Sequence, residues 1–195
     1  MRFTYPALIT SAIKLCRRYK NREHLEDEWQ SKVSTILKFV RQLTSILSTN
    51  VDAPSIALRL SLLSAQIADE CGFENLTYDI YVDAFTVYED SISESRAQLQ
   101  AITLIIGTLQ GARVFSEDNY DTLITKAALH GAKLLKKSHQ ASAVNLASHL
   151  WWQEVPPEEE AAEGEKEGGE KKNGAQEEGE KKAVSLGFHP QFDLY

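Results

Sequence analysis

The chain has 195 residues, of which 43% are hydrophobic and 25% charged, a balance that excludes a wholly disordered chain and is typical of a folded domain. Its net charge of −7 is concentrated in residues 154–182, which carry eleven acidic and five basic residues, so residues 1–153 are neutral overall. Because a nucleic-acid-binding protein of this size normally carries a basic excess, we do not expect nucleic acid as a partner.

Apolar residues recur every three or four positions through residues 1–153, a period that predicts helices and no strands. The predicted helices begin near residues 5, 24, 54, 74, 93, 117 and 141. Thr4 is a candidate cap for the first helix, and Pro6 falls in its first turn, where the missing amide proton is harmless. The second is predicted as one long amphipathic helix from His24 to Thr49, with Leu25 on its buried side.

Glycines and small polar residues mark the ends of the next helices. Gly72 stands where a helix commonly closes with a left-handed residue. The helix that begins at Ser93 is apolar on two sides, so we expect neighbours on both. We interpret Gly107 and Gly111 inside it as positions where another helix packs closely.

The last two helices complete an all-α chain. Ser116 is the expected cap of the sixth helix, whose inward residues include Leu135, and a short seventh runs from about residue 141 to 152. Alternate helices begin roughly 40 to 50 residues apart, as in repeats of paired helices. A compact bundle is the alternative, but two-sided burial and short connections favour an α-solenoid of antiparallel, HEAT-like pairs over residues 1–153.

The composition changes after the last predicted helix. Residues 154–183 are dominated by Glu, Lys, Gly and Ala and offer almost nothing to bury, so we expect this acidic segment to be disordered. Residues 184–195 regain aromatic side chains but are too short to form a core. We interpret this tail as unstructured, with a short docking peptide as the alternative.

No segment approaches the roughly 20 apolar residues that cross a bilayer, since the longest strongly apolar run is residues 101–107. Thr10 and Ser11 interrupt the stretch that a signal peptide would need. We therefore expect the folded part to be soluble and intracellular. Cys16 and Cys71 lie in helical patterns, and we interpret both as buried free thiols.

The sequence lacks the patterns of common catalytic and metal sites. None of its five histidines lies three or four positions from another, so no zinc site is predicted, and His130 is interpreted as a partly buried structural histidine. There is no glycine-rich phosphate loop, and the acidic run at residues 26–28 is spread around a helix and forms no carboxylate pair. We predict a protein that is not an enzyme and has no cofactor.

Charges of opposite sign gather at two helix connections. The turn YEDSISES at residues 88–95 carries Glu89, Asp90 and Glu94, and the connection after the sixth helix carries Lys133, Lys136 and Lys137. These could be ordinary solvent-facing charges. Alternatively, two copies of the chain could pair symmetrically, with the acidic patch of each facing the basic patch of the other.

Two tryptophans, Trp151 and Trp152, end the last predicted helix. Large aromatic side chains either cover a neighbouring helix or anchor a partner protein. We favour the covering role and keep the partner contact as the alternative.

Three stretches of the chain are distinctive: GFEN at residues 72–75, AFTVYEDSISESRAQLQAITLIIGT at residues 84–108, and FSEDN followed by KLLKK between residues 115 and 137. They resemble the family of vacuolar protein sorting-associated protein 35. The resemblance extends from about Tyr5 to Trp152, nearly the whole of the predicted folded part.

The resemblance implies a scaffold role. The family is the large α-solenoid subunit of retromer, the endosomal coat that returns transmembrane cargo to the Golgi or the plasma membrane, and the chain resembles part of its C-terminal half. That half wraps the retromer subunit vacuolar protein sorting protein 29, which is the implied partner. The implied location is the cytoplasm, peripheral on endosomal membranes and bound to them through partners. The alternative is a helical-repeat adaptor of another transport complex.

The resemblance also assigns roles to the charged turns. The family pairs two copies through an acidic turn and a basic helix end, which correspond to Glu89 and Asp90 and to Lys133, Lys136 and Lys137. In animal members an aspartate at the position of Glu94 influences recruitment of the WASH complex. Family members continue with further helices after the acidic segment, so the resemblance implies a truncated chain.

Overall fold

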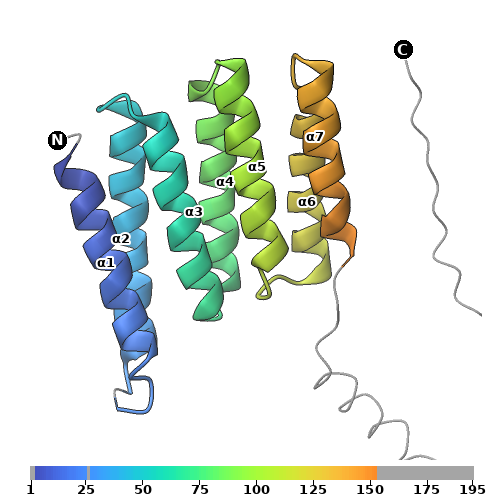
Figure 1. Ribbon diagram of the computed structural model, residues 1–195. Helices are drawn as coiled ribbons and strands as arrows, with labels where there is room; N and C mark the ends of the chain where they lie inside the picture. The colour runs from blue at the N-terminus through green and yellow to red at the C-terminus, as the bar shows by residue number, and fades with distance from the viewer. Residues whose placement is uncertain (1–2, 26, 153–195) are drawn as a thin grey trace, which may run out of the picture. The chain divides into compact units, whose positions relative to one another are not determined.

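The computed structural model describes residues 3–25 and 27–152. This part is built of α-helices closed by a 3₁₀ turn, without a strand (Figure 1). The elements are α1 (Thr4–Lys20), α2 (Trp29–Thr49), α3 (Pro54–Glu70), α4 (Glu74–Ser91), α5 (Ser95–Gly111), α6 (Glu117–Ala132), α7 (Lys137–Ser148) and η1 (His149–Trp151). The predicted all-α fold is confirmed, whereas the predicted acidic segment 154–183 and tail 184–195 lie outside the described residues.

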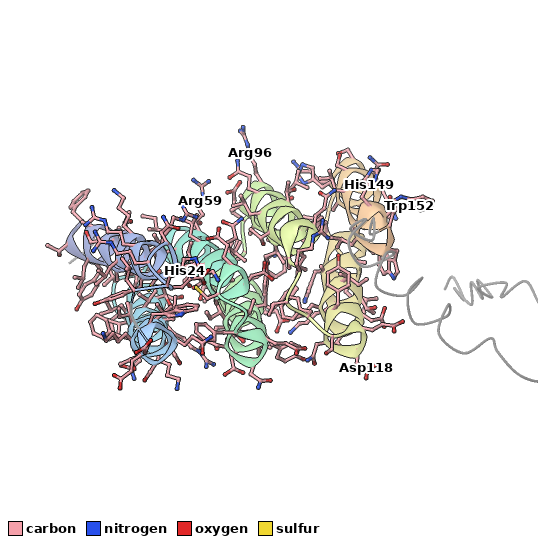
Figure 2. All side chains as sticks on the ribbon, turned by 90° about the horizontal axis from the view of Figure 1, so that it is seen from below. His24, Arg59, Arg96, Asp118, His149 and Trp152 are labelled. Atoms are coloured by element: carbon pink, nitrogen blue, oxygen red, sulfur yellow. The ribbon has the colours of Figure 1, made fainter. Side chains whose placement is uncertain are left out.

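Successive helices run antiparallel and form two layers. One layer contains α1, α3, α5 and α7, and the other contains α2, α4 and α6 (Figures 1 and 2). Arg59 of α3 and Arg96 of α5 project from the first layer, and Asp118 of α6 projects from the second (Figure 2). Each helix pair packs on the next, which is the α-solenoid arrangement predicted from the sequence.

A continuous hydrophobic core joins the helix pairs from α1 to η1. Among its fully buried side chains are Leu37 of α2, Phe85 of α4, and Ile102 and Leu109 of α5. As expected, α5 has neighbours on both sides, since it packs against α3 as well as α6 and α7. Burial of one such side chain contributes about 1.5–3 kcal/mol, so the shared core holds the pairs together.

Two carboxylates of the α3–α4 pair bind the connection between α5 and α6 and the first turn of α6. Asp69 of α3 accepts hydrogen bonds at 2.8 and 2.9 Å from the backbone N–H groups of residues 113 and 114. Glu74 of α4 accepts bonds from the backbone N–H and hydroxyl of Ser116 and from the Asn119 amide, at 2.6 to 2.8 Å. Ser116 is the N-cap residue of α6, as predicted, but its hydroxyl donates to Glu74 and makes no capping bond to the backbone of α6.

The predicted start of the second helix is also wrong. Residues 21–25 form turns, and α2 begins at Trp29 instead of His24. Leu25, expected to be buried, is 80% exposed, whereas Trp29 is buried with its ring centroid 6.4 Å from that of Phe73. The helix therefore starts where the chain returns to the core after α1.

Of the three glycines interpreted from the sequence, Gly72 has the expected conformation, whereas the other two are not close packing positions. Gly72 has a φ of +78°, as its position after α3 predicted. Gly107 and Gly111 have no atom within 4 Å of where a Cβ would lie, so their interpretation as close packing positions is wrong. The close contact is instead at Gly131, where a Cβ would lie 3.0 Å from the Cβ of Ala143.

Helix ends near the basic connection are displaced from their predicted positions. Leu135 lies beyond the end of α6 and is 82% exposed, because Leu134 takes the buried position. The seventh helix begins at Lys137, four residues before the expected Ala141. Both shifts place the lysines in and around a tight turn and not along a helix face.

Candidate functional site

The two charged turns lie at the same edge of the solenoid, where α4 passes into α5 and α6 passes into α7 (Figure 1). Both turns contain the same kind of internal hydrogen bond, from a glutamine side chain to a backbone carbonyl. The side-chain amide of Gln98 donates to the backbone carbonyl of Ile92 at 3.0 Å, and Gln140 donates to that of Leu134 at 2.6 Å. The two bonds stand 42 residues apart, so the turns are structural repeats of each other.

A direct contact joins the two turns: Ser95 Oγ and His139 Nδ1 lie 3.3 Å apart, at the starts of α5 and α7. The structure thus brings the predicted acidic and basic groups together on one edge. We call this the charged edge, defined by Glu89, Asp90, Glu94, Lys133, Lys136 and Lys137.

Glu89 is already paired within the chain. Its Oε1 lies 2.9 Å from Nζ of Lys126 and 2.9 Å from Nε2 of His130, both on α6. Hydrogen bonds from Lys126, and to a lesser extent from His130, hold the pKa of Glu89 below its usual value. Glu89 therefore ties the end of α4 to α6.

His130 completes this contact and is partly buried, as the sequence predicted, although its partners were not predicted. Its ring stacks on Phe85 at a centroid distance of 5.8 Å and meets Tyr88 edge-on at 5.1 Å. Burial lowers the pKa of His130, and the Glu89 carboxylate opposes this only in part. The sequence feature that could have indicated a shared contact is the spacing of Lys126 and His130, which are four residues apart and so lie on one helix face.

Asp90 and Glu94 differ from Glu89. Both are exposed, and neither pairs with a cation within the described residues. Asp90 lies in the last turn of α4, where the partial negative charge of the helix end disfavours a carboxylate. Glu94 is the residue that precedes α5, where the N-terminal partial charge favours a carboxylate. Of these two unpaired acids, Asp90 is the one that is unfavourably placed for the fold itself.

The lysines of the charged edge show a similar division. Lys133 follows the last residue of α6, where a cation is favourable. Lys136 is the N-cap residue of α7 and Lys137 its first residue, where exposed N–H groups disfavour a cation, and the first turn of α7 holds no acidic residue to compensate. All three lysines are exposed, and none pairs with a carboxylate in the part of the chain that is described.

Trp151 and Trp152 are exposed, contrary to the covering role that the sequence favoured. Leu150 is the buried residue of η1, and its carbonyl accepts a hydrogen bond from the Tyr120 hydroxyl at 3.1 Å. Trp151 is 53% exposed and Trp152 is 81% exposed, with Trp152 projecting outward beyond α7 (Figure 2). The two rings are therefore accessible to a partner.

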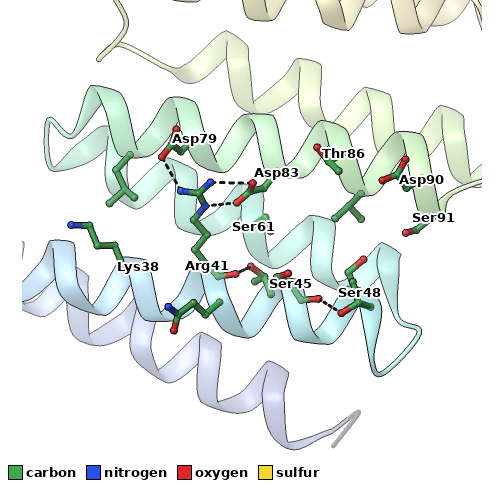
Figure 3. A pocket seen from close by; sticks show the side chains of 15 residues that line it. Lys38, Arg41, Ser45, Ser48, Ser61, Asp79, Asp83, Thr86, Asp90 and Ser91 are labelled. Atoms are coloured by element: carbon green, nitrogen blue, oxygen red, sulfur yellow. Dashed lines mark hydrogen bonds and ion pairs between the residues drawn. The ribbon is translucent and has the colours of Figure 1, made fainter.

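A groove of about 630 Å³, lined mainly by polar and charged residues and called the polar groove below, runs between α2 and α4 (Figure 3). Arg41 of α2 reaches across it to α4, with Nη1 2.8 Å from Asp79 and Nη2 3.1 Å from Asp83. The third carboxylate that lines it, Asp90, lies at the end next to the charged edge and beside Ser91 (Figure 3). The groove therefore opens onto the acidic turn.

Among residues 3–25 and 27–152, no group of three or more His, Cys, Asp or Glu side chains is arranged to hold a metal ion. Within the same residues, no helix combines the length and apolar character that a membrane span requires. The charged edge, the polar groove and the two tryptophans are the described features suited to contacting a partner.

Comparison with known proteins gives consistent matches. A family model described as vacuolar protein sorting-associated protein 35 matches residues 1–183. A relative of that name from Schizosaccharomyces pombe is 38% identical over 153 residues, which is 78% of this chain and 18% of the relative. Two relatives from Arabidopsis thaliana, named 35A and 35C, are each 42% identical over 79% and 76% of this chain, and 20% and 19% of their own lengths. The chain thus spans about a fifth of the length of the curated relatives it matches.

Proposed function

This chain belongs to the vacuolar protein sorting-associated protein 35 family, and from that premise we propose that it is a non-enzymatic scaffold segment of retromer in endosome-to-Golgi protein transport. It acts in the cytoplasm and reaches endosomal membranes through its partners. The family match is the observation that carries the proposal. The two-layer helical fold supports it, because stacked helix pairs expose broad surfaces for other subunits.

The first proposed partner is the protein 29 subunit of retromer. Standard protein interfaces bury about 800 Å² on each side, and aromatic side chains often dominate their energy. Trp151 and Trp152 are exposed aromatic residues at one end of the described solenoid and are proposed contacts, together with Glu94.

The second proposed partner is another copy of the chain, bound through the charged edge. The unpaired Asp90 and Glu94 and the lysines at positions 133, 136 and 137 support this proposal. A two-fold axis passing between the acidic and basic turns places each acidic turn opposite the basic turn of the other copy. Because these charges are exposed, raised salt weakens the pairing.

Sedimentation velocity of the full chain tests both contacts. We expect a heavier species when protein 29 is added, and self-association of the chain alone that falls between 50 and 500 mM salt. The double variant Lys136→Glu, Lys137→Glu should associate with itself more weakly. A matched control is Lys14→Glu, Arg18→Glu, which reverses two exposed charges on α1, away from the charged edge.

A second candidate function is that of an adaptor in another transport complex. It shares the fold and the exposed surfaces but predicts no binding to protein 29. A folded chain that gives no mixed species with protein 29 at micromolar concentrations would favour this candidate over the retromer scaffold.

A further inference from the structure

We propose that the polar groove binds the guanidinium group of an arginine that belongs to a segment of another protein, between Ser48 of α2 and Asp90 of α4. The chain already contains one contact of this kind, which Arg41 makes two helical turns earlier in the same groove. The proposal does not depend on self-association of the chain, and its ligand is not a second copy.

Arg41 shows how the polar groove holds a guanidinium group. It extends from α2 to α4, with Nη1 2.8 Å from Asp79 and Nη2 3.1 Å from Asp83. The two carboxylates are four residues apart and so lie on one face of α4. Because two carboxylates pair with one guanidinium, this part of the groove keeps an excess of negative charge and does not repel a second cation.

The same arrangement recurs seven residues further along both helices, but without the arginine. Asp90 follows Asp83 by seven residues on α4, and Ser48 follows Arg41 by seven residues on α2. Seven residues are close to two helical turns, so each helix returns to the same face. Figure 3 shows Ser48 and Asp90 on the α2 and α4 sides of the groove, as Arg41 and Asp83 are. Because serine is short and uncharged, no residue within 3–25 and 27–152 supplies a cation to Asp90.

Two buried hydroxyl groups face the groove and have no partner. Ser48 and Ser61 are only 7% and 4% exposed, and both line the groove. Neither hydroxyl forms a hydrogen bond to another residue of the described part of the chain. Since no fully enclosed side-chain polar atom among these residues lacks a partner, the two hydroxyls reach the groove. A buried hydroxyl without a partner is unfavourable, so both are suited to a ligand that donates hydrogen bonds.

The surroundings of Asp90 favour a cation as this ligand. The C-terminal ends of α2 and α4 both reach this end of the groove, and the last turn of neither helix contains a basic residue. The unpaired carbonyls at a helix C-terminus carry a partial negative charge that favours a cation. Thr49 and Ser91 add hydroxyl oxygens that accept hydrogen bonds.

A guanidinium group fits this set of acceptors better than an ammonium group. Its five N–H donors lie in one plane, so it can bind a carboxylate through two parallel bonds and still donate to hydroxyls beside it. An ammonium group is a point charge with three donors and offers no such paired geometry. The contact of Arg41 with Asp83 is an example of the first kind within the same groove.

The shape of the groove indicates that a protein segment presents this arginine. Pockets for small molecules enclose most of the ligand, whereas this groove is open along α2 and α4 (Figure 3). Stacked helix pairs offer such extended surfaces to other proteins. An arginine that enters from the open side can lay its aliphatic stem against Val87, which also lines the groove.

Titration of the full chain with the peptide Gly-Ser-Arg-Ser-Gly, followed by NMR, tests the proposal. We expect saturable binding with a dissociation constant of about 1 mM. The same peptide with citrulline, the uncharged isostere of arginine, should not bind. Asp90→Asn should weaken binding of the arginine peptide at least about tenfold. Asp118→Asn, which removes an exposed acid in the first turn of α6, is the matched control and should bind as the wild type does.

Two further variants test the geometry in opposite directions. Thr86→Asp gives Asp90 a second carboxylate four residues away, as Asp79 is to Asp83, and should tighten peptide binding about fivefold. Ser48→Arg supplies the guanidinium group from within the chain and should abolish peptide binding, while circular dichroism shows that the chain remains helical. Ser31→Arg, on α2 outside the groove, is its control and should leave binding unchanged.

Three results would overturn the proposal: equal binding of the arginine and citrulline peptides, unchanged binding by Asp90→Asn, or no binding at about 10 mM peptide. The Lys136→Glu, Lys137→Glu variant separates the groove from the proposed self-association. It should bind the peptide at least as tightly as the wild type, whether or not the wild type self-associates. Weaker binding by this variant would place the peptide at a contact between copies and would also overturn the assignment to the groove.

Discussion

The Glu74 carboxylate and the Ser116 hydroxyl lie 2.6 Å apart, although 42 residues separate them in sequence. Bonds from the Ser116 hydroxyl and backbone N–H and from the Asn119 amide converge on one oxygen of Glu74. They lower the pKa of Glu74 from 4.5 to about 2. One acid of α4 thereby binds the N-terminal end of α6 and couples the α3–α4 pair to the α5–α6 pair.

This contact makes the stability of the chain dependent on pH. Because the pKa of Glu74 is lower in the folded state, its contribution is fully present above about pH 4.5 and is lost as the pH falls toward 2. We expect Glu74→Gln to unfold at lower urea concentration at pH 7 and to lose part of the pH dependence between 4.5 and 2. Urea titrations followed by circular dichroism check this, with Glu117→Gln in the first turn of α6 as control. Equal pH dependence in wild type and Glu74→Gln would contradict the assignment.

The helical period gave the existence and order of the helices, but not the contacts that set their ends. The start of α2 depends on Trp29 reaching Phe73, a partner 44 residues away. The acids and lysines of the charged edge were identified from charge alone. The pairing of Glu89 with Lys126 and His130 could not be predicted in this way, because it depends on how α4 packs beside α6.

Two helix glycines should respond oppositely to the same substitution. Gly107→Ala should stabilise the chain by about 0.8–1 kcal/mol, because alanine is the better helix former and its Cβ meets no atom within 4 Å. At Gly131 the new Cβ would lie 3.0 Å from that of Ala143, so the gain should be absent or reversed. Chemical denaturation of both variants measures the difference. Equal stabilisation by both would show that α6 and α7 can separate at this point.

Cys16 and Cys71 should be unreactive while the chain is folded. Both are buried in the core as free thiols, as the sequence predicted, and burial raises the pKa of each to about 11. Because the thiolate is the reactive form, a thiol reagent at pH 7.5 should modify neither in the native chain and both in guanidinium. Ellman's reagent measures this. Rapid modification without denaturant would mean that the α1 and α3 ends open readily.

Leu150 and Trp152 allow packing to be separated from partner binding at the end of the described solenoid. Leu150 is 1% exposed, so Leu150→Ala should cost about 2–5 kcal/mol of unfolding free energy. Trp152 is 81% exposed, so Trp152→Ala should change stability by less than about 0.5 kcal/mol. If the ring anchors protein 29, Trp152→Ala should nevertheless weaken that complex at least about tenfold, measured by calorimetry. Unchanged affinity at unchanged stability would remove Trp152 from the proposed interface and place the contact elsewhere on the helical layers.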